Sequence, residues 1–250
     1  LYSRLPNDKV LIVANDTPEG REFDKTHELD IVRIELESTE WGLASTKGLG
    51  FYWETIRKVL KLIKEHGIEE VHCGRVIPEG VIARALKLLA GARYNCFVHG
   101  EDVETAATSR EHSLLVKNVC KNASMLICNS ENTANIVHKL GFDSGSKCEV
   151  LHPGVDTSRF EVAAPDTSFR QQMGWSGKRV LLTVGRLQRR KGQDFLIKSM
   201  PALLKEFPDL FYAVVGRGEC YDELISLVDQ HKLHDNVCVY PDMDDEALIK

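Results

Sequence analysis

The chain has 250 residues, of which 43% are hydrophobic and 28% charged, so it can fold as one large or two small globular domains and is not disordered as a whole. Its formal net charge of -5 excludes a protein that covers nucleic-acid phosphates with a general surplus of Lys and Arg. Any site for an anion must therefore be local.

Seven cysteines are scattered without regular spacing, several of them in apolar runs such as Met125–Cys128. A free thiol in such a run behaves as a small buried hydrophobic group, which indicates a reducing, cytoplasmic compartment. No window approaches the run of about 18 apolar residues that a membrane helix needs. The first residue is not methionine, and the last residues have the pattern of a helix just begun. We therefore expect both ends to be cut.

Short β-rich runs alternate with longer helical patterns through the first half of the chain. The expected strands are 9–14, 30–36, 70–73, 94–99, 125–129 and 148–152, and the expected helices are 52–66, 79–90, 111–121 and 132–140. The later strands are near-continuous apolar runs, which is typical of parallel strands covered by helices on both faces. This pattern predicts a doubly wound α/β sheet, whose ligands bind beyond the carboxyl ends of its strands.

The alternation stops after His152, where a stretch rich in Pro, Ala and Asp predicts an interdomain linker. It then restarts with expected strands 179–184, 210–215 and 237–240 and expected helices 193–207 and 221–231. The sequence therefore predicts two α/β domains, 1–153 and 154–250. We expect the first strand of the first domain to be missing and the second domain to be truncated.

A cluster of positive charge lies between the expected strand 179–184 and the helix that follows it. The segment from Arg186 to Lys191 carries four cations in six residues. A helix N-terminus offers unpaired N–H groups and about half a positive charge, and Arg and Lys add charge-assisted hydrogen bonds to phosphate oxygens. A solvated basic turn is the alternative, but the position between strand and helix favours an anion-binding site.

A second glycine loop, with Gly216 and Gly218, follows the strand 210–215. Without side chains at these positions the backbone can approach a ligand closely. The loop lacks the third glycine of the dinucleotide fingerprint, and neither loop ends in the Gly-Lys-Ser/Thr of a Walker P-loop, which argues against an ATPase. A ligand contact and a plain tight turn both stay open.

His99, Gly100 and two carboxylates follow the expected strand 94–99, where a ligand of a parallel sheet binds. A lone histidine is often merely structural, so the residues alone leave a functional and a structural role open. A metal site formed by His99, Asp102 and His112 is an alternative without recognisable ligand spacing.

Taken together, the order of these motifs resembles glycosyltransferase family 4, whose members are retaining enzymes with the GT-B fold of two Rossmann-like domains. The resemblance covers most of the chain. It is carried by four segments, namely Gly185-Arg186-Leu187 with Lys191-Gly192, Val150–Asp156 with Phe160, Val215–Gly218, and His99-Gly100. Pro153 departs from the family pattern, because Asn is common there.

The resemblance implies roles for three side chains in catalysis. Arg186 and Lys191 would hold the diphosphate of the donor and neutralise the charge on the departing nucleoside diphosphate. His99 would hydrogen-bond the donor sugar or the reacting region. The donor-binding residues that the resemblance implies are Gly185, Gly216, Gly218 and, for the nucleobase, Met243 and Asp245. Pro241 departs from the glycine often found in that last turn.

The implied activity is transfer of a hexose from a UDP- or GDP-sugar to a glycan or lipid-linked acceptor, as in polysaccharide biosynthesis. The resemblance implies no cofactor and no essential metal. The partners would be a nucleotide sugar and a glycan or glycolipid acceptor, and no nucleic acid. Peripheral contact with the inner face of the membrane stays open.

Two features of the family lie outside this sequence. Its first glycine-rich loop is expected before Leu1, and its paired glutamates are expected after Lys250. We therefore expect the piece itself to be inactive or poorly folded. Two other functions stay open: a non-catalytic partner subunit that binds sugar nucleotides or glycans, and an NAD-type dehydrogenase, which would need a Gly-x-Gly-x-x-Gly motif.

Overall fold

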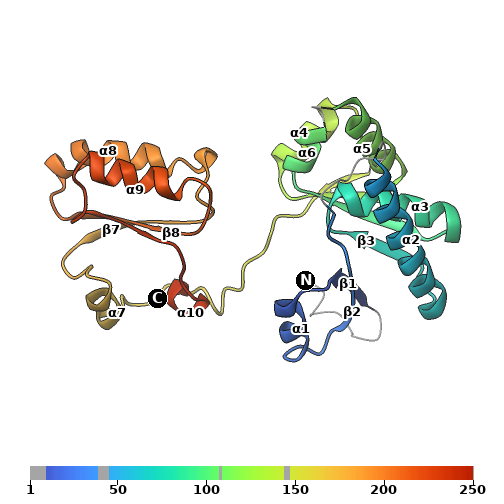
Figure 1. Cartoon of the computed structure of the whole chain (residues 1–250), viewed down its shortest axis with the longest axis horizontal. Helices are drawn as coiled ribbons and strands as arrows, with labels where there is room; N and C mark the ends of the chain where they lie inside the picture. The colour runs from blue at the N-terminus through green and yellow to red at the C-terminus, as the bar shows by residue number, and fades with distance from the viewer. Residues whose placement is uncertain (1–9, 39–44, 107–108, 144–146, 250) are drawn as a thin grey trace. The chain divides into compact units, whose positions relative to one another are not determined.

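The computed structural model describes residues 10–38, 45–106, 109–143 and 147–249. The chain forms two compact units, Leu1–Gly154 and Val155–Lys250. Each unit contains parallel strands joined by helices, as Figure 1 shows. The mixed α/β architecture with parallel sheets confirms the predicted fold class.

The first unit begins with a two-stranded parallel sheet. Strand β1 (Leu11–Asn15) pairs with strand β2 (Asp30–Ile34), and helix α1 (Pro18–Asp24) connects them. The apolar periodicity does not predict α1, which is short and contains no buried residue. The helix is defined by its start, where the Thr17 hydroxyl accepts a hydrogen bond from Gly20 N at 3.0 Å and Pro18 fixes the first turn.

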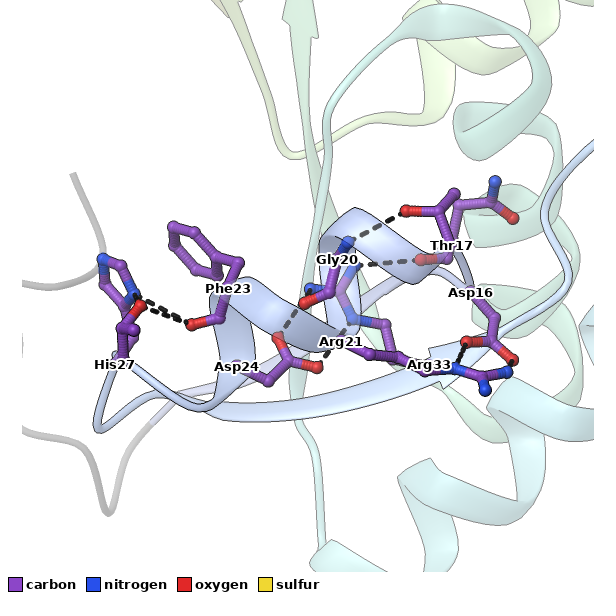
Figure 2. A network of polar contacts seen from close by, with 10 residues as sticks. Asp16, Thr17, Gly20, Arg21, Phe23, Asp24, His27 and Arg33 are labelled. Atoms are coloured by element: carbon purple, nitrogen blue, oxygen red, sulfur yellow. Dashed lines mark hydrogen bonds and ion pairs between the residues drawn. The ribbon is translucent and has the colours of Figure 1, made fainter. Parts of the chain in front are cut away.

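Arg33 of β2 ties helix α1 to this small sheet, as Figure 2 shows. Its guanidinium donates two hydrogen bonds to the carboxylate of Asp24, at 2.6 and 2.9 Å. It also donates to the carbonyls of Asn15 and Gly20, at 2.9 and 3.0 Å. One arginine therefore joins the end of β1, the helix and β2.

The main sheet of the first unit has four parallel strands in the order β3-β4-β5-β6. These strands are β3 (Glu70–Cys73), β4 (Arg93–Val98), β5 (Met125–Cys128) and β6 (Cys148–Val150). The helical elements around them are α2 (Thr46–His66), η3 (Val76–Gly80), α3 (Val81–Ala90), α4 (Glu101–Ala106), α5 (Arg110–Asn122) and α6 (Glu131–Lys139). This order places the ends of β3, β4 and β5, and the loops after them, at one edge of the sheet.

The core of the first unit lies against the central strand β4. Tyr94, Cys96 and Val98 alternate along this strand and are fully buried. The hydroxyl of Tyr94 donates to the carbonyl of Val119 in α5 at 2.6 Å, which satisfies the one polar atom of this large side chain. This bond fixes the strand against helix α5.

Two helices of the first unit begin two or more residues away from their expected starts. Helix α2 starts at Thr46, six residues before the expected start at Tyr52, because Ser45 caps it by accepting from Gly48 N at 2.9 Å. The glycines at its start have low helix propensity and conceal this turn in the sequence. Helix α3 starts at Val81, because the preceding residues form the separate turn η3.

The second unit contains a three-stranded parallel sheet in the order β7-β8-β9. Its strands are β7 (Arg179–Val184), β8 (Leu210–Val215) and β9 (Val237–Tyr240). Its helical elements are α7 (Thr167–Gln172), the short turn η4 (Arg189–Lys191), α8 (Gln193–Glu206), α9 (Tyr221–Gln230) and α10 (Asp245–Ile249). Figure 1 shows α8 and α9 on the same face of the sheet.

The central strand β8 is buried at all six positions, as its continuous apolar sequence predicts. On the face opposite α8 and α9, Trp175 packs against Phe211 with ring centroids 6.4 Å apart. Leu182 and Val184 of β7 are each 55% exposed, so the flanking strand β7 is covered less than the central strand. The best-packed strand of the sheet is therefore β8, which leads directly into the second glycine loop.

All seven cysteines are free thiols, and most are buried. Cys128 Sγ lies 3.3 Å from Cys148 Sγ on the neighbouring strand, which is beyond the length of a disulfide bond. This agrees with the interpretation of the cysteines as small hydrophobic groups.

Candidate functional site

The strands of the second unit end at a cavity of about 520 Å³. Its walls come from three loops, which follow β7, β8 and β9 in turn. The predicted site residues among its lining are Gly185, Arg186, Gly216, Gly218 and Met243. The cavity therefore lies at the carboxyl edge of the sheet, where the sequence places a ligand site.

The two glycine loops lie against each other and extend the pairing of β7 with β8. Gly185 N donates to Val215 O, and Leu187 N donates to Arg217 O, both at 2.9 Å. A Cβ atom at Gly216 would lie 2.0 Å from Gly185 O, and one at Gly218 would lie 2.3 Å from Leu187 O. Close backbone packing thus accounts for both glycines without a ligand, and their contact with a donor stays a prediction.

The basic segment after β7 is fixed to the core at its centre. The side chain of Leu187 is fully buried, and its carbonyl accepts from Cys220 N at 3.1 Å. Gly192, with a φ of 73°, ends the turn η4 and precedes helix α8. The four cations are therefore carried by a loop whose backbone is held on both sides of Arg186.

The four cations of this loop differ in the partners they have. Arg189 forms an ion pair with Glu223 of α9 at 3.2 Å, and Arg190 Nε donates to Gln188 Oε1 at the same distance. Arg186 and Lys191 are exposed and form no ion pair with any residue in the described ranges. Only Arg186 of these four lines the cavity. The structure therefore brings Arg186 to the cavity and leaves Lys191 outside its lining.

The third wall of the cavity is the turn after β9. Arg217 reaches across to this turn, where its Nε donates to Pro241 O at 3.3 Å and its Nη2 forms an ion pair with Asp242. Met243 and Leu248 add apolar surface beside this pair. Sequence reasoning missed Arg217, since the middle residue of a Gly-x-Gly turn carries no signal of its own. The side chain of Asp245 lies outside the described residues.

His99 follows β4 at the carboxyl edge of the first unit's main sheet. Its Nε2 is 2.9 Å from Gly74 O, and its backbone N–H donates to Asp102 Oδ1 at 3.1 Å. Asp102 Oδ2 also accepts from Val76 N at 3.3 Å. The carboxylate of Asp102 therefore organises the turn after β4, and the exposed imidazole is anchored by one of its two nitrogens. Among the described residues, no group of three or more His, Cys, Asp or Glu could hold a metal ion.

A larger cavity, of about 700 Å³, lies in the first unit between the edges of β1 and β3. Its walls are mainly apolar side chains of these strands and of α2 and α3. The charged side chains in its lining include Glu69, Glu70 and Glu79, whose carboxylates would repel a diphosphate. The lining of the smaller cavity includes Glu219 and Asp242 besides Arg186 and Arg217, and Asp242 is paired with Arg217. Because it contains arginine side chains, this cavity suits a nucleoside diphosphate better than the larger one does.

Comparison with known families matches both units. Residues 5–159 match Glycosyltransferase Family 4, and residues 166–250 match Glycosyl transferases group 1. The chain belongs to glycosyltransferase family 4. The family that the motifs of the basic loop and the glycine turns resemble is therefore confirmed.

Curated relatives of this chain include mannosyltransferases. The chain is 30% identical over 171 residues to a GDP-mannose-dependent alpha-(1-6)-phosphatidylinositol monomannoside mannosyltransferase of Mycolicibacterium smegmatis, covering 67% of this chain and 44% of the relative. It is 27% identical over 235 residues to a GDP-mannose-dependent monoacylated alpha-(1-6)-phosphatidylinositol monomannoside mannosyltransferase of Corynebacterium glutamicum, covering 84% of this chain and 61% of the relative. The chain thus spans roughly half the length of these two relatives.

Solved structures share the fold. The structure of Anabaena Alr3699/HepE in complex with UDP and glucose matches with a TM-score of 0.77 at 18% identity, covering 98% of this chain and 65% of that one. A glycosyltransferase from Rickettsia africae matches with a TM-score of 0.68 at 15% identity, covering 95% and 61%. These matches show that the chain has the GT-B fold. Within the described ranges, no helix has the length and apolar character needed to cross a membrane.

Proposed function

We propose that the intact protein is a retaining glycosyltransferase that moves a hexose from a nucleoside-diphosphate sugar to a hydroxyl group of a glycan or lipid-linked acceptor. The observation that carries this proposal is the position of Arg186. Its exposed guanidinium, without an ion-pair partner among the described residues, lines a cavity at the carboxyl edge of a parallel sheet. This is the arrangement that a diphosphate needs.

The chemistry of transfer explains why a cation belongs there. Breaking the bond between the sugar and the diphosphate leaves positive charge on the sugar ring and negative charge on the departing phosphate. A preorganised guanidinium stabilises that negative charge as it develops, and so lowers the barrier to transfer. We assign this role to Arg186 and, from the family resemblance, to Lys191. His99 is proposed to hydrogen-bond the transferred sugar.

We propose GDP-mannose as the donor, because several relatives of the chain are named for it. Gly185, Gly216 and Gly218 would allow the diphosphate to approach the backbone, and Met243 and Asp245 would contact the base. The alternative donor is a UDP-sugar, which is supported by the Anabaena protein, whose structure is a complex with UDP and glucose. The names of the same relatives support a lipid-linked acceptor, and such an acceptor would entail peripheral contact with a membrane.

The proposed reaction needs no cofactor and no metal ion, since protein cations take the role that a divalent ion would have at the diphosphate. Transfer should therefore persist in excess EDTA. A non-catalytic partner subunit that binds sugar nucleotides is the competing function. It would use the same cation to bind the diphosphate, so release of the nucleoside diphosphate is the result that distinguishes the two functions.

The test is to incubate the intact protein with a panel of GDP- and UDP-sugars, with and without lipid-linked glycan acceptors, and to measure released nucleoside diphosphate. We expect acceptor-dependent release of GDP from GDP-mannose, unchanged by EDTA. Release of UDP alone would show that the donor is a UDP-sugar and not GDP-mannose. Tight donor binding without release in the presence of any acceptor would favour the partner subunit.

A further inference from the structure

Gln193 is a buried polar residue beside the proposed diphosphate site. It is the first residue of helix α8, and only 2% of its surface is exposed. In the sequence it stands between Gly192 and Asp194. Burying an amide side chain is costly unless its polar atoms find partners, so its contacts explain why glutamine occupies this position.

The partner of Gln193 is the backbone of Arg186. Its Nε2 donates to the carbonyl of Arg186 at 3.1 Å, across seven residues of sequence. Neither atom of this bond belongs to a regular helix or strand ladder. The bond therefore connects the start of helix α8 directly to the residue whose guanidinium lines the cavity.

Backbone bonds hold the loop on either side of Arg186, and the bond from Gln193 holds Arg186 itself. Gly185 N and Leu187 N donate to the carbonyls of Val215 and Arg217, each at 2.9 Å. The carbonyl of Arg186 and the N–H of Leu187 belong to one peptide plane, so the bond from Gln193 and the bond to Arg217 O hold opposite edges of that plane. Among the hydrogen bonds of the described residues, the bond from Gln193 is the one in which a side chain holds the backbone of residues 185–187.

We propose that Gln193 is a positioning residue, which fixes the backbone of Arg186 so that its guanidinium is directed at the donor's diphosphate. This inference rests on the proposed function, because it assigns Gln193 a role through Arg186. A small displacement of a charged group at a reacting centre has a large effect on rate, so an anchored backbone is valuable at this position. The competing explanation is that the bond merely satisfies a buried carbonyl and stabilises the fold.

A double-mutant cycle separates the two explanations, with GDP affinity measured by calorimetry on the intact protein. Gln193→Met keeps the length of the side chain and removes the donor, and Gln193→Leu removes the donor with a shorter, uncharged side chain. In the presence of Arg186, we expect either variant to weaken GDP binding about tenfold. In the Arg186→Ala background the same changes should have no further effect, because Gln193 acts through the guanidinium.

Asn236 provides a matched control in the same unit. Its Nδ2 donates to the carbonyl of Leu210 at 3.1 Å, at the amino end of β8 and outside the cavity lining. Asn236→Leu should lower the melting temperature and leave GDP affinity unchanged. If Gln193→Met destabilises the protein so far that GDP affinity cannot be measured, the cycle is completed with Gln193→Leu.

The results that would overturn the inference are equally specific. An equal loss of GDP affinity with and without Arg186 would assign Gln193 a purely structural role, as would no loss at all. Failure of the proposed function gives another result: the unmodified protein would bind neither GDP nor UDP, and the inference would fall with it.

Discussion

Arg186 and Arg189 are three residues apart in one basic loop, yet their guanidinium groups differ in whether they are available to bind a ligand. Arg189 is tied to Glu223, whereas Arg186 has no ion-pair partner in the described ranges and lines the cavity. Charge composition alone treats these residues as equivalent. Their contacts separate them, and they make Arg189→Ala the natural control for Arg186→Ala.

The thiol of Cys120 gives the chain a defined sensitivity to alkaline pH. Cys120 is 1% exposed, and burial raises the pKa of its thiol to about 12, with a smaller effect from the negative charge of Asp102. In the unfolded chain the pKa of a cysteine is about 8.5, so the folded state keeps a proton that the unfolded state loses. The stability that this group provides is complete below about pH 8.5 and is lost as pH rises toward 12.

We therefore expect the urea concentration at the midpoint of unfolding to fall between pH 8 and pH 10.5. Burial also raises the pKa of Tyr52 and of Tyr240 to about 12, which acts in the same direction at the upper end of this range. Cys120→Ala should reduce the slope of midpoint against pH. A midpoint that stays constant or increases over this range would contradict the effect of burial.

The packing of the two glycine loops predicts unequal effects of adding a methyl group. Gly216 and Gly185 have φ values of 151° and 155°, so alanine is strained at both positions. A Cβ at Gly216 would also meet Gly185 O at 2.0 Å, whereas one at Gly185 has no neighbour within 4 Å. We expect Gly216→Ala to lower the free energy of unfolding by about 3 kcal/mol and Gly185→Ala by about 1 kcal/mol. Urea unfolding measures both, and equal losses would show that loop contact is unimportant.

The network around Arg33 predicts that α1 depends on one side chain. The Arg33 side chain is 18% exposed and bonds to Asp24 and two backbone carbonyls, whereas the Arg21 side chain is 68% exposed in its pair with Asp16. Exposed ion pairs add little to stability. Arg33→Met should therefore speed hydrogen exchange of the amides in α1, and Arg21→Met should leave it nearly unchanged. Similar exchange in both variants would exclude this anchoring role.

Sequence patterns predicted the strands of this fold more accurately than its short helices. β3, β7, β8 and β9 have the expected bounds, and the last three are short, mainly apolar runs between polar turns. Helices α1 and α4 are absent from the expected elements, since neither is long enough to show an apolar period. Local capping defines α1, and recognising it requires the geometry of Thr17 and Gly20.

The candidate site was predictable as a set of motifs but not as a set of contacts. Glycines and cations after buried strands predict a phosphate site, and the structure brings Gly185, Arg186 and Gly216 to one cavity. The role of Gln193 could not be predicted, because a glutamine at the start of a helix is usually exposed. The ion pair of Arg217 with Asp242 could not be predicted either, because the two residues are 25 apart in the sequence.

The two units of the molecule have separate cores, and the cavity proposed for the donor nucleotide is lined by residues of the second unit alone. Ligand binding stabilises the state that binds it by about 2.7 kcal/mol at a ligand concentration of 100 Kd. Saturating GDP should therefore slow hydrogen exchange in β7, β8 and the start of α8. Amides in the core strand β4 of the first unit should exchange as before. Protection confined to the first unit would place the nucleotide elsewhere.

The most direct test of the central claim compares the affinities of GDP and guanosine for the intact protein and for Arg186→Ala. If Arg186 grips the diphosphate, the substitution should weaken GDP binding about 100-fold and change guanosine binding less than about twofold. Arg189→Ala should leave both affinities within about twofold of the unmodified protein. Unchanged GDP binding by Arg186→Ala, or an equal loss for GDP and guanosine, would contradict the role assigned to this residue.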